Sequence, residues 1–182
     1  MAHVLVPLAN GCEELEAVTI IDLLRRAEIE VTTAGLEEEP VKASRGVVLL
    51  PDTTLDNALT KDYDMVILSG GLPGADYLDQ DPRIQMLLKN MITTGKPVAA
   101  ICAAPKVLAT AGLLENKSAT SYPGVLDTMD LPGTNYTGDA VTKDGNVITS
   151  RGPGTAMDFA LALIEELAGK EIRNSVEAGL VR

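Results

Sequence analysis

The chain has 182 residues, of which 46% are hydrophobic and 23% are charged. This composition excludes a disordered chain, and we expect residues 1–182 to form a single domain with a well-developed core. The net charge of −11 argues against nucleic-acid phosphates and anionic membrane surfaces as main partners.

The amino-terminal part of the chain alternates between strand and helix patterns. An apolar run at 3–9 predicts a buried strand. Helical spacing at 13–27, with acids in the first turn and arginines in the last, predicts a helix that starts soon after this strand. The β-branched run at 29–34 predicts a second strand, and the runs at 41–43 and 47–50 predict a small hairpin.

The middle of the chain continues the alternation. The apolar run at 65–68 predicts a central strand that ends in Ser69-Gly70-Gly71. A helix is predicted at 82–94, followed by a short apolar strand at 98–101 and by another helix at 105–111.

The last third of the chain has weaker strand patterns at 118–122, 140–142 and 147–149, with a hairpin turn signal at Asp144-Gly145. A final long helix is predicted at 155–168, after a glycine- and proline-rich opening.

Strands that alternate with helices predict an α/β fold whose largely parallel sheet is covered on both faces. Ligands of such sheets bind beyond the carboxyl ends of the strands. We therefore expect the loops that follow the strands at 3–9, 65–68 and 98–101 to meet in one pocket.

Cys102 follows the apolar strand directly and lies among small residues that a tight strand-to-helix turn requires. Such an elbow brings its central side chain to the start of a helix, where backbone N–H groups favour a thiolate. Cys102 is thus a candidate nucleophile, and we expect it to titrate well below a free thiol. A buried structural cysteine is the alternative, since free cysteine behaves as a small hydrophobic residue.

Glu16 lies in line with the apolar stripe of the first predicted helix, four residues before Ile20. Burial raises the pKa of a carboxyl group, and a protonated carboxyl can donate a hydrogen bond to a thiolate. The alternative is an acid of the first helical turn that bends into water, which is our expectation for Glu13 and Glu14.

Gly70 and Gly71 also have two interpretations. They can be a simple turn, or they can let backbone N–H groups approach an oxyanion. His3 begins the first strand, so we expect it at the end of the sheet opposite to Cys102, and not as a catalytic base. For Cys12 we favour a structural or peripheral thiol.

With two isolated cysteines and a single histidine, the chain has no set of zinc ligands. The cysteine usage and the lack of a signal-peptide pattern lead us to expect a cytoplasmic protein. The apolar start at 4–8 is too short for a membrane span.

Five ordered motifs resemble the ThiJ/PfpI superfamily, in the branch of the parkinsonism-associated protein deglycase and its bacterial ThiJ-like relatives. They lie at 11–18, 44–46, 69–71, 99–105 and 149–155 and together extend over nearly the whole chain. The resemblance implies a flavodoxin-like three-layer α/β/α sandwich and a homodimer.

For the site, the resemblance implies a reactive Cys102 that is hydrogen-bonded to a protonated Glu16, with backbone N–H contacts from Gly71 and Ala103. Gly70 belongs to the same loop. Cofactor-free conversion of methylglyoxal to lactate and removal of early glycation adducts from proteins or nucleotides are the implied activities. Protection against oxidative stress and chaperone activity are implied as well. Neither a metal nor an organic cofactor is expected.

The resemblance makes Arg45, Tyr122 and Pro153 candidates for the pocket. Animal members of the branch have a histidine where this chain has Tyr122, so one candidate proton shuttle is missing. The protease-like branch has a histidine directly after the cysteine, and Ala103 at this position argues against a peptidase. A redox sensor, in which the oxidation of Cys102 changes partner binding, is the alternative to an enzyme. A chaperone that holds unfolded proteins is a third possibility and requires an exposed apolar patch.

Overall fold

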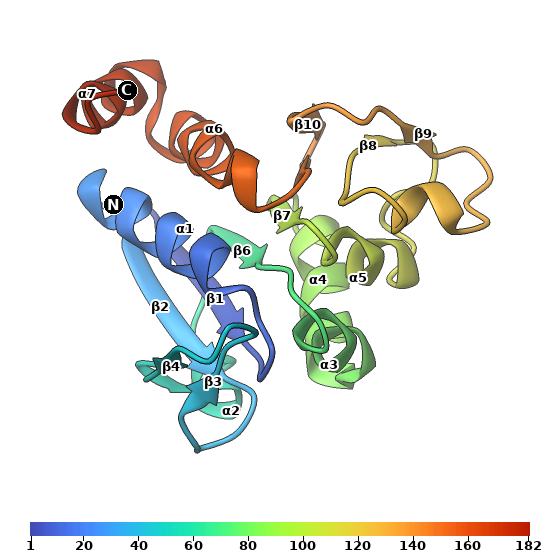
Figure 1. The fold of residues 1–182 in the computed structure, drawn as a ribbon, viewed down its shortest axis with the longest axis horizontal. Helices are drawn as coiled ribbons and strands as arrows, with labels where there is room; N and C mark the ends of the chain where they lie inside the picture. The colour runs from blue at the N-terminus through green and yellow to red at the C-terminus, as the bar shows by residue number, and fades with distance from the viewer.

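A seven-stranded sheet forms the centre of the fold in the computed structural model, which describes all residues from 1 to 182 (Figure 1). In spatial order its strands are β10 (Val141–Asp144), β11 (Val147–Ser150), β7 (Val98–Ile101), β6 (Met65–Leu68), β1 (His3–Leu8), β2 (Glu30–Gly35) and β5 (Thr53–Thr54). All neighbouring strands run parallel except β10 and β11, which form an antiparallel hairpin. The predicted, mostly parallel sheet is confirmed.

Helices cover both faces of this sheet, as Figure 1 shows. One face is covered by α1 (Glu14–Arg26) and α6 (Ala156–Ala168), and α7 (Lys170–Gly179) packs against α6. The opposite side carries α2 (Leu55–Ala58), α3 (Gly74–Gln80), α4 (Pro82–Thr93) and α5 (Pro105–Thr110). The predicted three-layer α/β/α sandwich is therefore confirmed.

Side-chain alternation along the strands divides the core into two clusters. In β1, Val4, Val6 and Leu8 pack with α1 and α6, whereas Leu5 belongs to the cluster on the α4 and α5 side. This division follows from the two-residue period of a strand, which sends successive side chains to opposite faces.

Two small sheets lie outside the central one. The predicted hairpin forms from β3 (Val41–Lys42) and β4 (Val48–Leu49). The strand predicted at 118–122 is reduced to β8 (Ser118–Ala119), which pairs in parallel with β9 (Asn135–Tyr136) and not with the central sheet. Short 3-10 helices occur at Leu126–Thr128 and Pro153–Thr155.

The start of α1 lies at the carboxyl end of β1 because Glu13 caps the helix there. The Glu13 side chain accepts hydrogen bonds from the backbone N–H groups of Leu15 and Glu16, which have no partner inside the helix. Arg25 and Arg26 lie in the last turn, where the helix dipole favours positive charge. Glu16 is thereby held in the first turn, beside the ends of the central strands.

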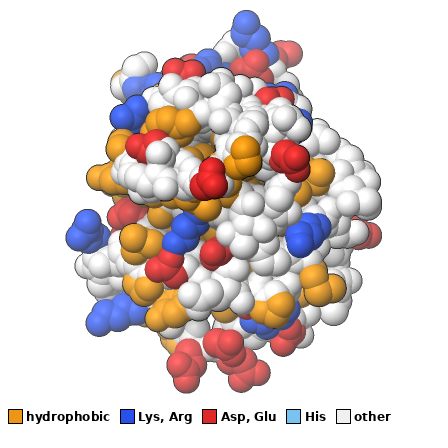
Figure 2. Space-filling view, turned by 90° about the vertical axis from the view of Figure 1, so that its right-hand side faces the viewer, with side chains coloured by type: hydrophobic (Ala, Val, Ile, Leu, Met, Phe, Trp, Pro, Cys, Tyr) orange, Lys and Arg blue, Asp and Glu red, His pale blue; other side chains and the backbone are white.

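Figure 2 shows the face of the molecule that lies on the right in Figure 1, where α3, α5, β8 and β9 are found. Acidic and basic side chains are interspersed on this face, with small hydrophobic areas between them. No helix of the chain combines the length and the apolar character that a membrane span requires.

Candidate active site

Cys102 occupies a backbone elbow between β7 and α5. Its φ angle of 66° lies in the left-handed region, which is unfavourable for a residue with a side chain. The elbow is fixed on both sides: the Cys102 N–H donates to the Ser150 carbonyl over 3.0 Å, and the Cys102 carbonyl accepts from the Tyr122 N–H over 2.8 Å. Such a conformation persists only where its surroundings impose it, and it is common at functional sites.

Gly70 and Gly71 allow the loop after β6 to touch two other loops. A Cβ atom on Gly70 would lie 2.7 Å from the Cys102 Cβ, and one on Gly71 would lie 2.4 Å from the Glu13 nitrogen. Gly71 also has a φ angle of 85°, which favours glycine. The loops after β1, β6 and β7 therefore meet in one place, as the alternation of strands and helices predicted.

The Glu16 carboxyl is completely buried at this junction. Its Oε2 accepts a hydrogen bond of 2.8 Å from the Gly70 N–H. The carboxyl also interacts with the Cys102 side chain, which favours its ionised form, while its Oε1 has no hydrogen-bond partner. Burial raises the pKa of Glu16 to about 7, although the contacts with Cys102 and Gly70 act in the opposite direction.

The prediction that Cys102 ionises well below a free thiol is wrong for this environment. Burial, followed by the nearby Glu16, raises the pKa of Cys102 to about 12, although the Gly71 and Ala103 N–H groups favour the thiolate. After the first ionisation, the thiol and the carboxyl hold one proton between them. The carboxyl is therefore the group that ionises near neutral pH, and a Cys102 thiolate in this singly protonated pair requires that the proton lies on Glu16.

Cys12 lies in the loop between β1 and α1 and is 1% exposed. Burial and the neighbouring glutamates, Glu14 first, raise the pKa of its thiol to about 12. The backbone of Gly74 packs so closely that a Cβ there would lie 2.8 Å from the Cys12 Cα. This environment is that of a protonated thiol inside a packed loop.

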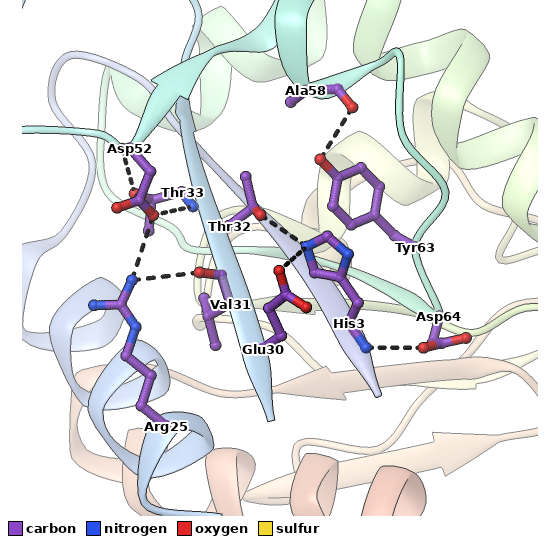
Figure 3. Close-up of polar contacts among 10 residues, drawn as sticks. All are labelled: His3, Arg25, Glu30, Val31, Thr32, Thr33, Asp52, Ala58, Tyr63 and Asp64. Carbon is purple, nitrogen blue, oxygen red and sulfur yellow. Dashed lines mark hydrogen bonds and ion pairs between the residues drawn. The ribbon is translucent and has the colours of Figure 1, made fainter. Parts of the chain in front are cut away.

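His3 begins β1 and therefore lies at the end of that strand opposite to this junction. Figure 3 shows His3 with its neighbours Thr32, Glu30 and Tyr63. Its Nε2 lies 2.8 Å from the Thr32 Oγ1 and 3.7 Å from a Glu30 oxygen. Its ring packs edge-on against Tyr63, with 4.6 Å between the centroids. The side chain thus stabilises the amino ends of β1 and β2.

Tyr122 and Pro153 adjoin the elbow. Besides the hydrogen bond from its N–H to Cys102, Tyr122 places its ring against Gly152, where a Cβ would lie 3.2 Å from a ring carbon. The Tyr122 side chain is 51% exposed. Pro153 follows Gly152 directly, at the start of the turn that leads into α6.

Arg45 lies apart from these residues, in the exposed turn between β3 and β4. Its backbone N–H donates to Glu14 over 2.8 Å, and the residue itself is exposed. The structure therefore brings together Cys102, Glu16, Gly70, Gly71, Ala103 and the Tyr122 backbone, but not the Arg45 side chain.

The expectation of a solvated Glu14 is wrong. Glu14 is 9% exposed, and its carboxylate binds the turn between β3 and β4 through the Ser44 hydroxyl, at 3.0 Å, and the Arg45 N–H. Burial alone raises the pKa of Glu14, but hydrogen bonds from its own N–H, Ser44, Val47 and Arg45 leave it below the ordinary value.

A further polar group of the junction, Ser69, was not singled out by the sequence patterns. It follows β6 directly, is completely buried, and its hydroxyl has no hydrogen-bond partner. The only signal in the sequence is a hydroxyl at the end of an otherwise apolar strand.

A cavity outside this junction is not lined by Cys102 or Glu16. It has a volume of about 550 Å³ and lies beside the loop after β1, between the loop after β2 and the start of α4. Leu8, Asn10, Leu36, Tyr77 and Arg83 are among its lining residues. The junction around Cys102 is instead narrow, and Cys102 itself is 8% exposed.

Residues 2–166 match the model of the DJ-1/PfpI family. Protein dj-1beta of Drosophila melanogaster is 48% identical over 97% of this chain and 95% of its own length. The Parkinson disease protein 7 homolog of Danio rerio is 45% identical over 97% of this chain and 95% of its own. The glutathione-independent glyoxalase DJR-1.2 of Caenorhabditis elegans is 39% identical over 96% of this chain and 92% of its own.

The crystal structure of Drosophila melanogaster DJ-1beta superposes on this chain with a TM-score of 0.93, over 99% of this chain and 97% of that one. The sequence and the fold of this chain thus both match those of DJ-1beta over the length that the motifs cover. This chain is therefore a member of the DJ-1/PfpI family.

Proposed function

We propose that this protein is a cysteine-dependent, cofactor-free glyoxalase that converts methylglyoxal and water to lactate. The observation that carries the proposal is the interaction of Cys102, on its strained elbow, with the fully buried carboxyl of Glu16. Similarity to a relative named glutathione-independent glyoxalase supports the choice of reaction.

The first step is the addition of the Cys102 sulfur to the aldehyde carbon. Glu16 takes the thiol proton, and the thiolate forms a carbon–sulfur bond that yields a hemithioacetal. The negative charge develops on the former aldehyde oxygen, where the N–H groups of Gly71 and Ala103 are the available donors. Glu16 then gives the thiol proton to this oxygen, which completes the hemithioacetal and restores the Glu16 carboxylate. Both N–H groups already face the sulfur, so little reorganisation is needed.

The second step moves a proton between the two carbons of the adduct. The Glu16 carboxylate removes the proton from the carbon bonded to sulfur and returns it to the neighbouring carbonyl carbon. The hydroxyl proton passes from the former aldehyde oxygen to the former ketone oxygen, which leaves a 2-hydroxy thioester. Water then cleaves the thioester, releases lactate and restores the Cys102 thiol. A carboxyl whose pKa is about 7 suits this exchange, because it gives and accepts a proton with equal ease near neutral pH.

Removal of early glycation adducts is the same chemistry on a larger substrate, and it is part of the proposal. Such an adduct is formed from the same aldehyde and an amine or thiol of a protein or nucleotide. Because Cys102 is 8% exposed, the free aldehyde reaches the sulfur more easily than an adduct held on a protein surface. We therefore expect methylglyoxal itself to be the faster substrate.

The decisive experiment compares wild type with Glu16→Gln in lactate formation from methylglyoxal without added glutathione. The amide keeps the shape of the carboxyl and an oxygen for the Gly70 N–H, but it cannot accept and return a proton. We expect turnover to fall by about 10² or more, the usual contribution of a general acid or base. Asp22→Asn is the matched control, because Asp22 is an exposed acid on the same helix.

A second readout separates catalysis from redox sensing. Intact mass after mild peroxide treatment reports how far Cys102 oxidises in each variant. Loss of lactate formation together with a changed oxidation profile supports a proton shuttle. If the wild type forms no lactate and only the oxidation profile depends on Glu16, the protein is a redox sensor and the proposed reaction is wrong.

A further inference from the structure

Ser69 carries a buried hydroxyl on the α1 side of the sheet. In β6, Met65 and Ile67 pack with the side chains of α1, and Ser69 follows two residues after Ile67 on the same face. The pairing of Leu68 with Ala100 places Ser69 beside Ile101, which belongs to that same cluster. Ser69 thus ends β6 under the first turn of α1, where Glu16 lies.

Two buried side-chain atoms of the chain have no hydrogen-bond partner, and they lie at the same junction. They are the Ser69 Oγ and the Glu16 Oε1. The other oxygen of Glu16 accepts from the N–H of Gly70, the residue directly after Ser69. The two unpartnered oxygens therefore belong to residues that the hydrogen bond between Gly70 and Glu16 holds at one junction, although no hydrogen bond joins the two oxygens in this conformation.

A buried hydroxyl without a partner is unfavourable by about 1–3 kcal/mol, so a small apolar residue would stabilise the fold more at this position. Rotation about one bond moves the Ser69 hydroxyl among its staggered positions without a change in the backbone. A carboxylate oxygen is the strongest acceptor that such a hydroxyl can meet in an apolar environment.

We infer that the Ser69 hydroxyl donates a hydrogen bond to the Glu16 Oε1 whenever Glu16 is ionised. When Glu16 is protonated, its own O–H faces the Cys102 sulfur. Ser69 is thus a positioning residue. Its hydroxyl stabilises the carboxylate form of Glu16 and keeps the carboxyl group oriented as Glu16 changes between its ionised and protonated forms. Its importance for turnover rests on the function proposed above, but the hydrogen bond itself does not.

Few other groups stabilise the negative charge of Glu16, which makes the Ser69 donor significant. Glu13 disfavours the negative charge of Glu16, and the Cys12 and Cys102 thiols are kept protonated partly by that charge. No arginine, lysine or histidine is paired with the carboxyl, so only the Gly70 N–H and the thiol favour its ionised form. Ser69 adds a donor where positive charge is lacking.

The test replaces the hydroxyl and follows the titration of the Glu16 carboxyl directly. In Ser69→Ala we expect the pKa of Glu16 to rise by about one unit, because one hydrogen bond to a charged group is lost. The ¹³C shift of the Glu16 carboxyl across pH, assigned with Glu16→Gln, measures this change. Ser69→Thr keeps the hydroxyl and should return the titration towards that of wild type.

A second measurement follows the reactivity of the Cys102 sulfur, which should increase when the Glu16 carboxylate is destabilised. When the carboxylate is less stable, the shared proton moves to Glu16 and the charge to Cys102, so alkylation by iodoacetamide at pH 8 should become up to about tenfold faster. Ser118→Ala, which removes a hydroxyl that accepts a hydrogen bond from Asn135 far from the site, should change neither value. An unchanged Glu16 titration in Ser69→Ala overturns the inference, whereas failure of wild type to form lactate affects only the proposed function.

Discussion

At the scale of single residues, the Glu16 side chain works against the stability of the fold. Burial raises its pKa to about 7, whereas a glutamate of an unfolded chain titrates near about 4.3. Below about pH 4.3, Glu16 is protonated in both the folded and the unfolded chain, and its ionisation does not change the free energy of unfolding. As the pH rises through both values, the unfolded chain loses this proton first, so the free energy of unfolding falls.

Glu16→Gln should remove this pH-dependent penalty. We expect the variant to be close to wild type in stability at pH 4 and more stable by about 3.5 kcal/mol at pH 8, since one pKa unit corresponds to about 1.4 kcal/mol. Urea unfolding at both pH values measures the difference, with Asp22→Asn as the control. An equal effect of the substitution at pH 4 and pH 8 would show that the carboxyl is not titrating in the folded state.

The same residues show what the sequence can and cannot predict about the site. Cys102 and Glu16 were found because the strand-to-helix pattern and the helical spacing give their positions. The sequence does not show how deeply a group is buried, so the thiol pKa was predicted with the wrong sign. The expectation of a solvated Glu14 fails because its partner Ser44 comes from a segment distant in the chain, and the burial of the unpartnered Ser69 hydroxyl depends on the complete fold.

At the scale of elements, the long strands and helices were predicted because each has its own apolar period. The elements not predicted depend on tertiary contacts. Helix α3 begins at Gly74 without a side-chain cap, and the close packing of Gly74 against Cys12 fixes its start. Helix α7 has one buried side chain, Val176, and packs on α6. Strand β8 pairs with β9, which has too few residues for a pattern.

The junction between α1 and the β3–β4 hairpin is held by the Glu14 carboxylate, so Glu14→Ala should loosen the hairpin. The Ser44 hydroxyl and the Arg45 N–H would lose their acceptor. We expect hydrogen exchange at the Arg45 and Val47 amides to accelerate by about tenfold or more, while exchange in β1 stays slow. Glu37→Ala, a change of an exposed glutamate, is the control; equal exchange in both variants would mean that Glu14 does not anchor the turn.

At the scale of the whole molecule, α1 and the hairpin both carry exposed apolar side chains. Helix α1 has more hydrophobic positions than one buried stripe requires: Ile20, Leu23 and Leu24 are buried, but Leu15 and Val18 are about half exposed. The hairpin bound to α1 by Glu14 adds Val47, Val48 and Leu50, which are exposed as well. We call these five exposed side chains the α1–β4 patch. Exposed apolar side chains on two elements that are joined in this way are typical of an interface.

We predict that the α1–β4 patch is the contact surface of a homodimer, as the family resemblance implies. A twofold axis through the patch would bring the same side chains of two copies together, and an apolar surface is complementary to itself. Sedimentation at micromolar concentration should give a species of twice the 19.1 kDa mass of the chain.

Val48→Glu would bury two like charges against each other and should shift the protein to monomer. Met86→Glu, a change at an equally exposed side chain on α4, should leave the dimer intact. If the wild type sediments as a monomer, or if both variants behave alike, the α1–β4 patch is not the interface.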